Sequence, residues 1–194
     1  TLEGLTKPGI DLVFSNVGPG YEWLTLALGQ SAAWHRGRPG SVELFALGPC
    51  DLTFAMMRRQ YWLAALFGID TYFQSLYHQR ARRFETKDSY AMFTSPAQPW
   101  FGESRLLHDE ARKASAWAKK PQVCALAVVY PQRTAGACAL ARRPAPDLAG
   151  LCRTLSWNGF NYLLIEEDEK TGLPHVLDWQ GTNLVDRATG TRLV

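Results

Sequence analysis

Long apolar runs are absent from this sequence of 194 residues. A membrane-spanning helix needs about 20 consecutive apolar residues. The longest apolar segment, residues 61–67, is far shorter. We therefore expect a soluble protein without a membrane partner.

Cysteine is sparse and scattered. The four cysteines, at positions 50, 124, 138 and 152, form no CxxC pair and have no histidine at ligand spacing. This pattern counts against a zinc site and against a dense disulfide framework. It favours a reducing compartment such as the cytoplasm over secretion, and no metal site is expected.

A strong charge excess is also missing. Lysine and arginine number 21 against 18 acidic residues, a net charge of +3, which is too small to indicate nucleic-acid binding. The chain contains no Gly-x-Gly-x-x-Gly, Walker, Gly-x-Ser-x-Gly or HExxH pattern. Nucleotide-binding, serine-hydrolase and zinc-protease functions are therefore disfavoured, and no cofactor is expected.

What is present is an alternation of apolar strands and helical segments. Short apolar runs bounded by Gly and Pro are typical of buried parallel strands. Three such runs separated by two helical segments predict a βαβαβ arrangement and hence the α/β class. The expected elements are a strand over 10–15, a helix over 21–35, a strand over 42–47, a helix over 52–67 and a strand over 69–76.

The rest of the chain predicts a second group of elements. A long polar and aromatic segment, 77–102, leads to a helix over 103–118 that ends before Pro121. We then expect a strand over 123–130, a loop over 134–146, a helix over 148–157, a strand over 161–165 and a β-hairpin within 176–194. The composition changes near residue 120, which predicts two domains, 1–120 and 121–194.

Glu43 is the most conspicuous candidate for chemistry. It is an acid inside an apolar strand, where an unpaired charge costs several kcal/mol. One interpretation is a carboxylate that serves as nucleophile or base toward a polar substrate. The other is an outward-facing glutamate paired with Arg36 or Arg38, and spacing alone leaves both open.

Ligands of parallel α/β proteins bind at the carboxyl ends of the strands. That rule selects Asn16 after the first strand and Tyr77, His78 and Gln79 after the third. Hydrogen-bonding groups of this kind bind sugar hydroxyls, although His78 is equally interpreted as a surface histidine. Trp100 is either a sugar-stacking residue or an anchor for its loop.

Four acidic residues, 166–169, follow the strand NYLLI. Such a run binds a cation in some proteins, but a hydrated surface is the favoured interpretation here.

The segments SVELFALGPCD, MMRRQYWLAALFGIDTYFQSLYHQRARRF and QPWFGE occur in this order. They resemble the last strands of the (β/α)8 barrel in large bacterial glycoside hydrolases of the retaining-barrel superfamily, including β-galactosidase-like and rhamnosidase-like proteins. The resemblance covers residues 10–117. It implies a partial TIM barrel, a carbohydrate substrate, Glu43 as the catalytic nucleophile, and Tyr77, His78 and Trp100 on the substrate-facing loop.

A second resemblance covers VCALAVVYPQRT and LAGLCRTLSWNGFNYLLIEEDE, which look like the start of a flavodoxin-like, amidotransferase-shaped domain. The barrel family holds its second catalytic carboxyl group on an earlier strand, outside this sequence. The chain also begins at Thr1 without methionine, which indicates a processed product or a piece of a longer protein. The expected protein partner is then the missing N-terminal part of the barrel or another copy of the chain.

The expected function is retaining glycoside hydrolysis, with these residues as part of the enzyme. The alternative is a carbohydrate-binding or assembly protein without catalysis, in which the aromatic residues are retained and the catalytic pair is lost. A third interpretation is an independent small flavodoxin-like domain.

Overall fold

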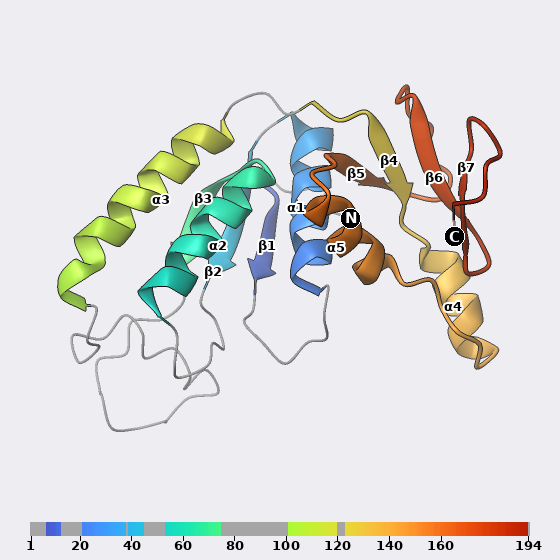
Figure 1. Ribbon diagram of the computed structural model, residues 1–194, viewed down its shortest axis with the longest axis horizontal. Helices are drawn as coiled ribbons and strands as arrows, with labels where there is room; N and C mark the ends of the chain where they lie inside the picture. The colour runs from blue at the N-terminus through green and yellow to red at the C-terminus, as the bar shows by residue number, and fades with distance from the viewer. Residues whose placement is uncertain are drawn as a thin grey trace. The chain divides into compact units, whose positions relative to one another are not determined.

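The computed structural model describes residues 7–12, 21–37, 39–44, 53–74, 101–119 and 123–193 (Figure 1). The protein is α/β, as predicted, and its described strands form one three-stranded and one four-stranded sheet. Contacts divide the chain into a first unit, Thr1–Gly18 with Ala32–Pro121, and a second unit, Pro19–Ser31 with Gln122–Val194. The assignment of 1–120 to a barrel and 121–194 to another domain stays a prediction.

The first unit contains the predicted parallel sheet. Its strand order is β1-β2-β3, and both pairs are parallel. Helix α1 connects β1 to β2, and α2 connects β2 to β3, which confirms the βαβαβ arrangement. The bounds are β1 (Gly9–Leu12), α1 (Tyr21–Arg36), β2 (Gly40–Leu44), α2 (Phe54–Leu66) and β3 (Ile69–Gln74).

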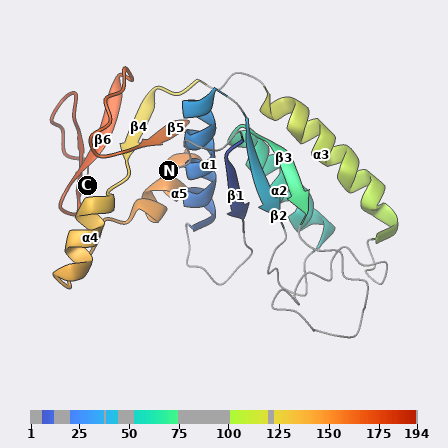
Figure 2. The ribbon, with the colours of Figure 1, turned by 180° about the vertical axis from the view of Figure 1, so that it is seen from behind.

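One face of this sheet packs on α2. The ring of Tyr61 on α2 contacts the ring of Tyr72 on β3 edge to face, with centroids 5.1 Å apart. Tyr72 is the register partner of Val42, which is 1% exposed. Side chains alternate between the two faces of a strand, so Glu43 lies on the opposite face. Figure 2 shows the three strands in front of α2 when the unit is seen from that side.

Local signals set the ends of the helices. Thr53 caps α2, because its side chain accepts a hydrogen bond from the backbone N–H of Met56 at 3.2 Å. Gly68 follows α2 with φ +70°, a left-handed conformation that favours glycine. A 3-10 turn, η3 (Phe101–Glu103), leads into α3 (Ser104–Ala118), which packs on α2 and β3. The predicted helix over 103–118 is thus confirmed.

The second unit contains a mixed sheet in the order β5-β4-β6-β7. Strand β4 pairs in parallel with β5 and β6, and β7 pairs with β6 in the predicted antiparallel hairpin. Gly181 forms the hairpin turn at φ +66°. The bounds are β4 (Leu126–Val129), β5 (Tyr162–Ile165), β6 (His175–Gln180) and β7 (Asn183–Asp186).

The prediction of a loop over 134–146 is wrong in its first half. Helix α4 occupies Gln132–Leu140. Alanine is the strongest helix former and contributes every second residue from 135 to 139, whereas Pro144 and Pro146 lie beyond the helix end and do not interrupt it. Helix α5 occupies Leu148–Trp157, the predicted bounds.

Polar contacts attach the N-terminal part of α1 to the sheet of the second unit. The Ser31 hydroxyl accepts a hydrogen bond from the backbone N–H of Leu164 at 2.7 Å. The Gln30 amide donates to Asn161 Oδ1 at 2.5 Å. Gln30 and Ser31 are buried, so these bonds satisfy groups that are costly to leave unpaired.

In the described part of the chain, no helix combines the length and the apolar composition that a bilayer crossing requires.

Candidate functional site

Asp11 and Glu43 form a pair of acidic side chains on the β1–β2–β3 sheet. They are register partners on neighbouring parallel strands, so their side chains lie on the same face. Phe73 on β3 is the next residue in the same row. We call this set, Asp11, Glu43 and Phe73, the carboxylate row.

All three residues of the carboxylate row are exposed, and Phe73 is 58% exposed. Burial of Leu12, Val42 and Leu44, which alternate with them, fixes the opposite face as the apolar one. The row therefore combines two carboxylates with an aromatic ring on a solvent-accessible surface. Carboxylates and aromatic rings are the groups that protein sites use toward sugars.

The charge of Glu43 influences the carboxyl group of Asp11. Partial withdrawal of the Asp11 carboxyl from water, followed by the negative charge of Glu43, raises the pKa of Asp11 above its ordinary value of 3.8. Within the described part of the chain, Glu43 takes part in no hydrogen bond or ion pair. The pair thus contains one group, Asp11, whose protonated form is favoured by its surroundings, next to a second acidic side chain.

The pairing of Glu43 with Arg36 or Arg38 stays open, because neither arginine side chain is among those described. The predicted substrate-binding residues also lie outside the described residues: Asn16, Tyr77, His78, Gln79 and Trp100. Among the predicted site residues, Glu43 is therefore the one whose position the structure describes.

Lys7 supports the sheet near the start of β3. Its ammonium group forms an ion pair with Asp70 at 2.7 Å and donates to the hydroxyl of Thr71. The negative charge of Asp70 therefore has a cationic partner within the first unit.

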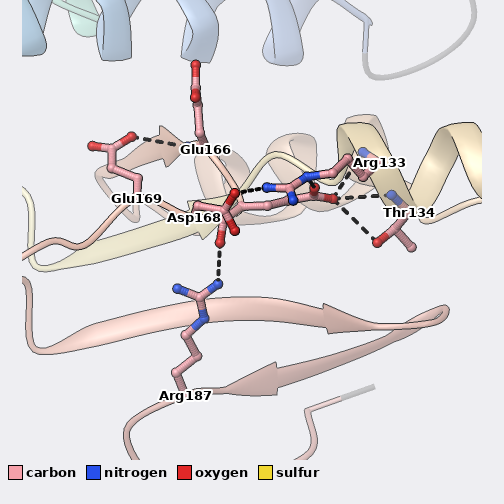
Figure 3. A network of polar contacts seen from close by, with 7 residues as sticks. Arg133, Thr134, Glu166, Asp168, Glu169 and Arg187 are labelled. Carbon is pink, nitrogen blue, oxygen red and sulfur yellow. Dashed lines mark hydrogen bonds and ion pairs between the residues drawn. The ribbon is translucent and has the colours of Figure 1, made fainter.

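The acidic turn after β5, residues 166–169, contacts the start of α4 (Figure 3). Glu167 Oε1 accepts hydrogen bonds from the backbone N–H groups of Arg133 and Thr134, at 3.1 and 3.2 Å. Glu167 Oε2 lies 2.7 Å from Nε of Arg133. Since the first N–H groups of a helix lack partners inside the helix, Glu167 acts as a cap for α4.

Further arginine contacts complete this turn. Arg133 also pairs with Asp168. Arg187 donates to the backbone oxygen of Glu167 at 3.0 Å (Figure 3). It also donates to Asp178 Oδ2 at 2.9 Å. The described residues contain no group of three or more acidic, histidine or cysteine side chains arranged to hold a metal. The acidic turn is thus interpreted as a structural connection.

Two cysteines of the second unit, Cys124 and Cys152, are poor nucleophiles. Burial raises the pKa of Cys124 and of Cys152 to about 11. At neutral pH both are protonated thiols, and the thiolate is the reactive form. No disulfide is formed by Cys124, Cys138 or Cys152.

Sequence reasoning did not identify Asp11 or Phe73 as site residues. Both lie in strands that were predicted, and the alternation of strand side chains was the available signal. The missing information was the register, because a shift of one residue moves a side chain to the other face.

Comparison with known proteins finds no match to a family model, a curated protein or a solved structure.

Proposed function

We propose that the chain is part of a retaining glycoside hydrolase in which Glu43 is the nucleophile and Asp11 the acid/base. The observation that supports this function is the in-register position of the two carboxylates on one exposed sheet face. Neighbouring strands are about 4.8 Å apart. Retaining glycosidases hold their two carboxyl groups roughly 5 to 5.5 Å apart.

The protonation state required of the acid/base agrees with the electrostatics of Asp11. The acid/base must carry a proton when the substrate binds, and the raised pKa of Asp11 favours that state. The nucleophile must be ionised and unencumbered, and Glu43 has no ion-pair partner among the described residues. This assignment of Asp11 departs from the family resemblance, which places the acid/base on an earlier strand outside this sequence.

The reaction would proceed in two steps. A Glu43 carboxylate oxygen attacks the anomeric carbon, the glycosidic C–O bond breaks, and the Asp11 proton passes to the leaving oxygen. Water then attacks the anomeric carbon of the glycosyl ester, Asp11 accepts a proton from this water, and the Glu43 carboxylate is released. The proposed substrate-binding residues are those of the resemblance: Asn16, Tyr77, His78, Gln79 and Trp100.

Two finer assignments of the fold belong to this proposal. The first unit is proposed to be the end of a TIM barrel, which the order of three parallel strands with helical connections supports. The second unit is proposed to be flavodoxin-like. Its support is the order β5-β4-β6, which corresponds to the 2-1-3 start of that strand order.

The test is covalent trapping with 2-deoxy-2-fluoro glycosides that carry a good leaving group. We expect an adduct on Glu43, detected by intact mass and peptide mapping, and no adduct in Glu43→Gln. Asp11→Asn should retain trapping, because the activated leaving group needs no proton. Glu103→Gln, an exposed acid before α3, is the matched control.

The alternative function, carbohydrate binding without catalysis, gives a different result. A binding protein would show sugar affinity by titration calorimetry that is unchanged in Glu43→Gln, with no adduct in the original chain. An adduct on another carboxylate would overturn the roles assigned to Asp11 and Glu43.

A further inference from the structure

Strand β3 forms one edge of the sheet in the first unit. Among the described residues, β3 pairs with β2 alone. An edge strand presents a row of backbone N–H and C=O groups without a ladder partner, which makes it a template for another strand. Such a strand can add to β3 only where there is space beside it.

A groove of about 460 Å³ lies between β3 and α3. On the strand side it is lined by three consecutive residues, Asp70, Thr71 and Tyr72. Successive side chains of a strand point to opposite faces of the sheet. A groove on one face would therefore be lined by every second residue, whereas a groove along the edge of the strand is lined by consecutive residues. The helix side is lined by Ala111, Arg112, Ser115, Ala116 and Lys119.

The helix wall of the groove is built largely from small side chains. Ala111 and Ser115 are four residues apart, as are Arg112 and Ala116, so the lining forms two rows along α3. Because Ala111, Ser115 and Ala116 have short side chains, this wall leaves space along the edge of β3.

The charges at the groove favour an acidic occupant. Asp70 is already neutralised by Lys7 at 2.7 Å. Arg112 is 80% exposed and pairs with Asp109 at the groove rim. Lys119 is exposed and forms no ion pair within the described part of the chain. Lys119 is therefore a cation at the rim that can pair with a carboxylate of an occupant.

We propose that this groove takes up an extended segment of a partner protein, which adds a strand to the edge of β3 and places an acidic side chain beside Lys119. Main-chain hydrogen bonds to β3 supply the affinity in this mode of recognition, and the charged rim supplies selectivity. The proposal uses neither Asp11 nor Glu43, so its test is separate from the test of hydrolysis. It competes with the proposed barrel, because a closed barrel would pair the edge of β3 with another of its own strands.

The experiment measures fluorescence anisotropy of a labelled hexapeptide, acetyl-Thr-Val-Glu-Val-Thr-Val-amide, titrated with the full chain. Three control peptides are used. One replaces Glu by Lys, and the other two carry methyl groups on alternate backbone nitrogens, one peptide for each of the two registers. We expect binding of the first peptide, weaker binding of the Lys peptide, and loss of binding for one methylated register.

Variants of the chain then locate the binding site. Lys119→Glu should weaken the Glu peptide roughly threefold to tenfold and strengthen the Lys peptide. Arg105→Glu, the same change of charge at an exposed position of α3, is the matched control and should leave both affinities unchanged. Ser115→Trp should block the groove, with its folding checked by circular dichroism.

Other outcomes overturn the proposal. These are the absence of peptide binding up to millimolar chain, equal binding of the unmethylated peptide and both methylated peptides, or equal effects of Lys119→Glu and Arg105→Glu. Concentration-dependent dimerisation that excludes the peptide would assign the groove to another copy of the chain and would also overturn it.

Discussion

Asp11 and Glu43 are Cα partners on β1 and β2, and their side chains share one exposed face of a parallel sheet. Like charges in this position destabilise each other's ionised forms. The pair therefore links a backbone property, the register, to a chemical one, the readiness of Asp11 to hold a proton.

The first prediction concerns this coupling. Glu43→Gln removes the negative charge beside Asp11, so the pKa of Asp11 should fall toward 3.8. The return should be partial, because withdrawal from water is the larger cause of the shift and remains in the variant. Carbon-detected NMR titration of the Asp11 carboxyl measures the change. An unchanged titration in Glu43→Gln would contradict the coupling, and Glu103→Gln serves as the control.

The second prediction concerns acid stability of the first unit. Glu110 on α3 accepts hydrogen bonds from Nε1 of Trp62 at 2.8 Å, Arg58 at 3.0 Å and Lys113 at 3.2 Å. These partners lower the pKa of Glu110 from 4.5 to about 2. The folded state therefore binds the Glu110 proton less tightly than the unfolded chain, which stabilises the fold at pH values above 4.5.

This stabilisation should be lost progressively as the pH falls from 4.5 toward 2. Glu110→Gln should lower the melting temperature at neutral pH and show a weaker dependence on pH in the acid range. Thermal denaturation followed by circular dichroism between pH 2 and 7 measures both effects. Glu103→Gln should retain the original profile, and an identical profile for Glu110→Gln would refute the assignment.

The third prediction separates a helix cap from a surface ion pair. Glu167→Ala removes the acceptor for two backbone N–H groups of α4 and should cost about 0.5–2 kcal/mol in the free energy of unfolding. Asp168 is a partner of Arg133, and its side chain is 81% exposed. Asp168→Ala should therefore lower the free energy of unfolding by only about 0–1 kcal/mol. Urea denaturation measures both variants.

Hydrogen exchange adds a local readout to that comparison. Loss of the Glu167 cap should accelerate amide exchange in the first turn of α4, at Arg133 and Thr134, whereas the Asp168 variant should leave it unchanged. Equal protection in both variants would show that Glu167 does not cap the helix.

The fourth prediction concerns thiol reactivity. Cys124 and Cys152 are buried, and burial raises the pKa of each to about 11. Cys138 on α4 is partly exposed. Iodoacetamide at pH 8 should therefore modify Cys138 well before the other two, as followed by peptide mass spectrometry. Denaturant should remove the difference, and early labelling of Cys152 in the native chain would disprove its burial.

Much of the architecture is encoded in local patterns. The bounds of α5 follow from its helical spacing together with Asp147 at the start, whose side chain caps Gly150 at 2.8 Å. The hairpin follows from Gly181, which supplies the left-handed turn. Helix α4 was not predicted, because nearby arginines and prolines outweighed the strong helix propensity of its alanines.

The candidate site was less accessible to sequence reasoning. Glu43 was identified because an acid inside an apolar strand stands out within a single segment. Asp11 was not identified, because its significance depends on Glu43. This residue lies 32 positions further along the chain and becomes a neighbour of Asp11 only through the register of the two strands. The hydrated-surface interpretation of residues 166–169 likewise missed the cap that Glu167 provides for α4.

By itself, the sequence determined the α/β class, the order of its strands along the chain and the position of an acid in an otherwise apolar strand. These properties depend on near neighbours, on periodicity and on turn residues. Only the tertiary structure decided that Asp11 stands beside Glu43, that Glu167 reaches α4, and which edge of the sheet lies next to a groove. The physical reason is that strand register and packing join residues whose separation along the chain leaves no local trace.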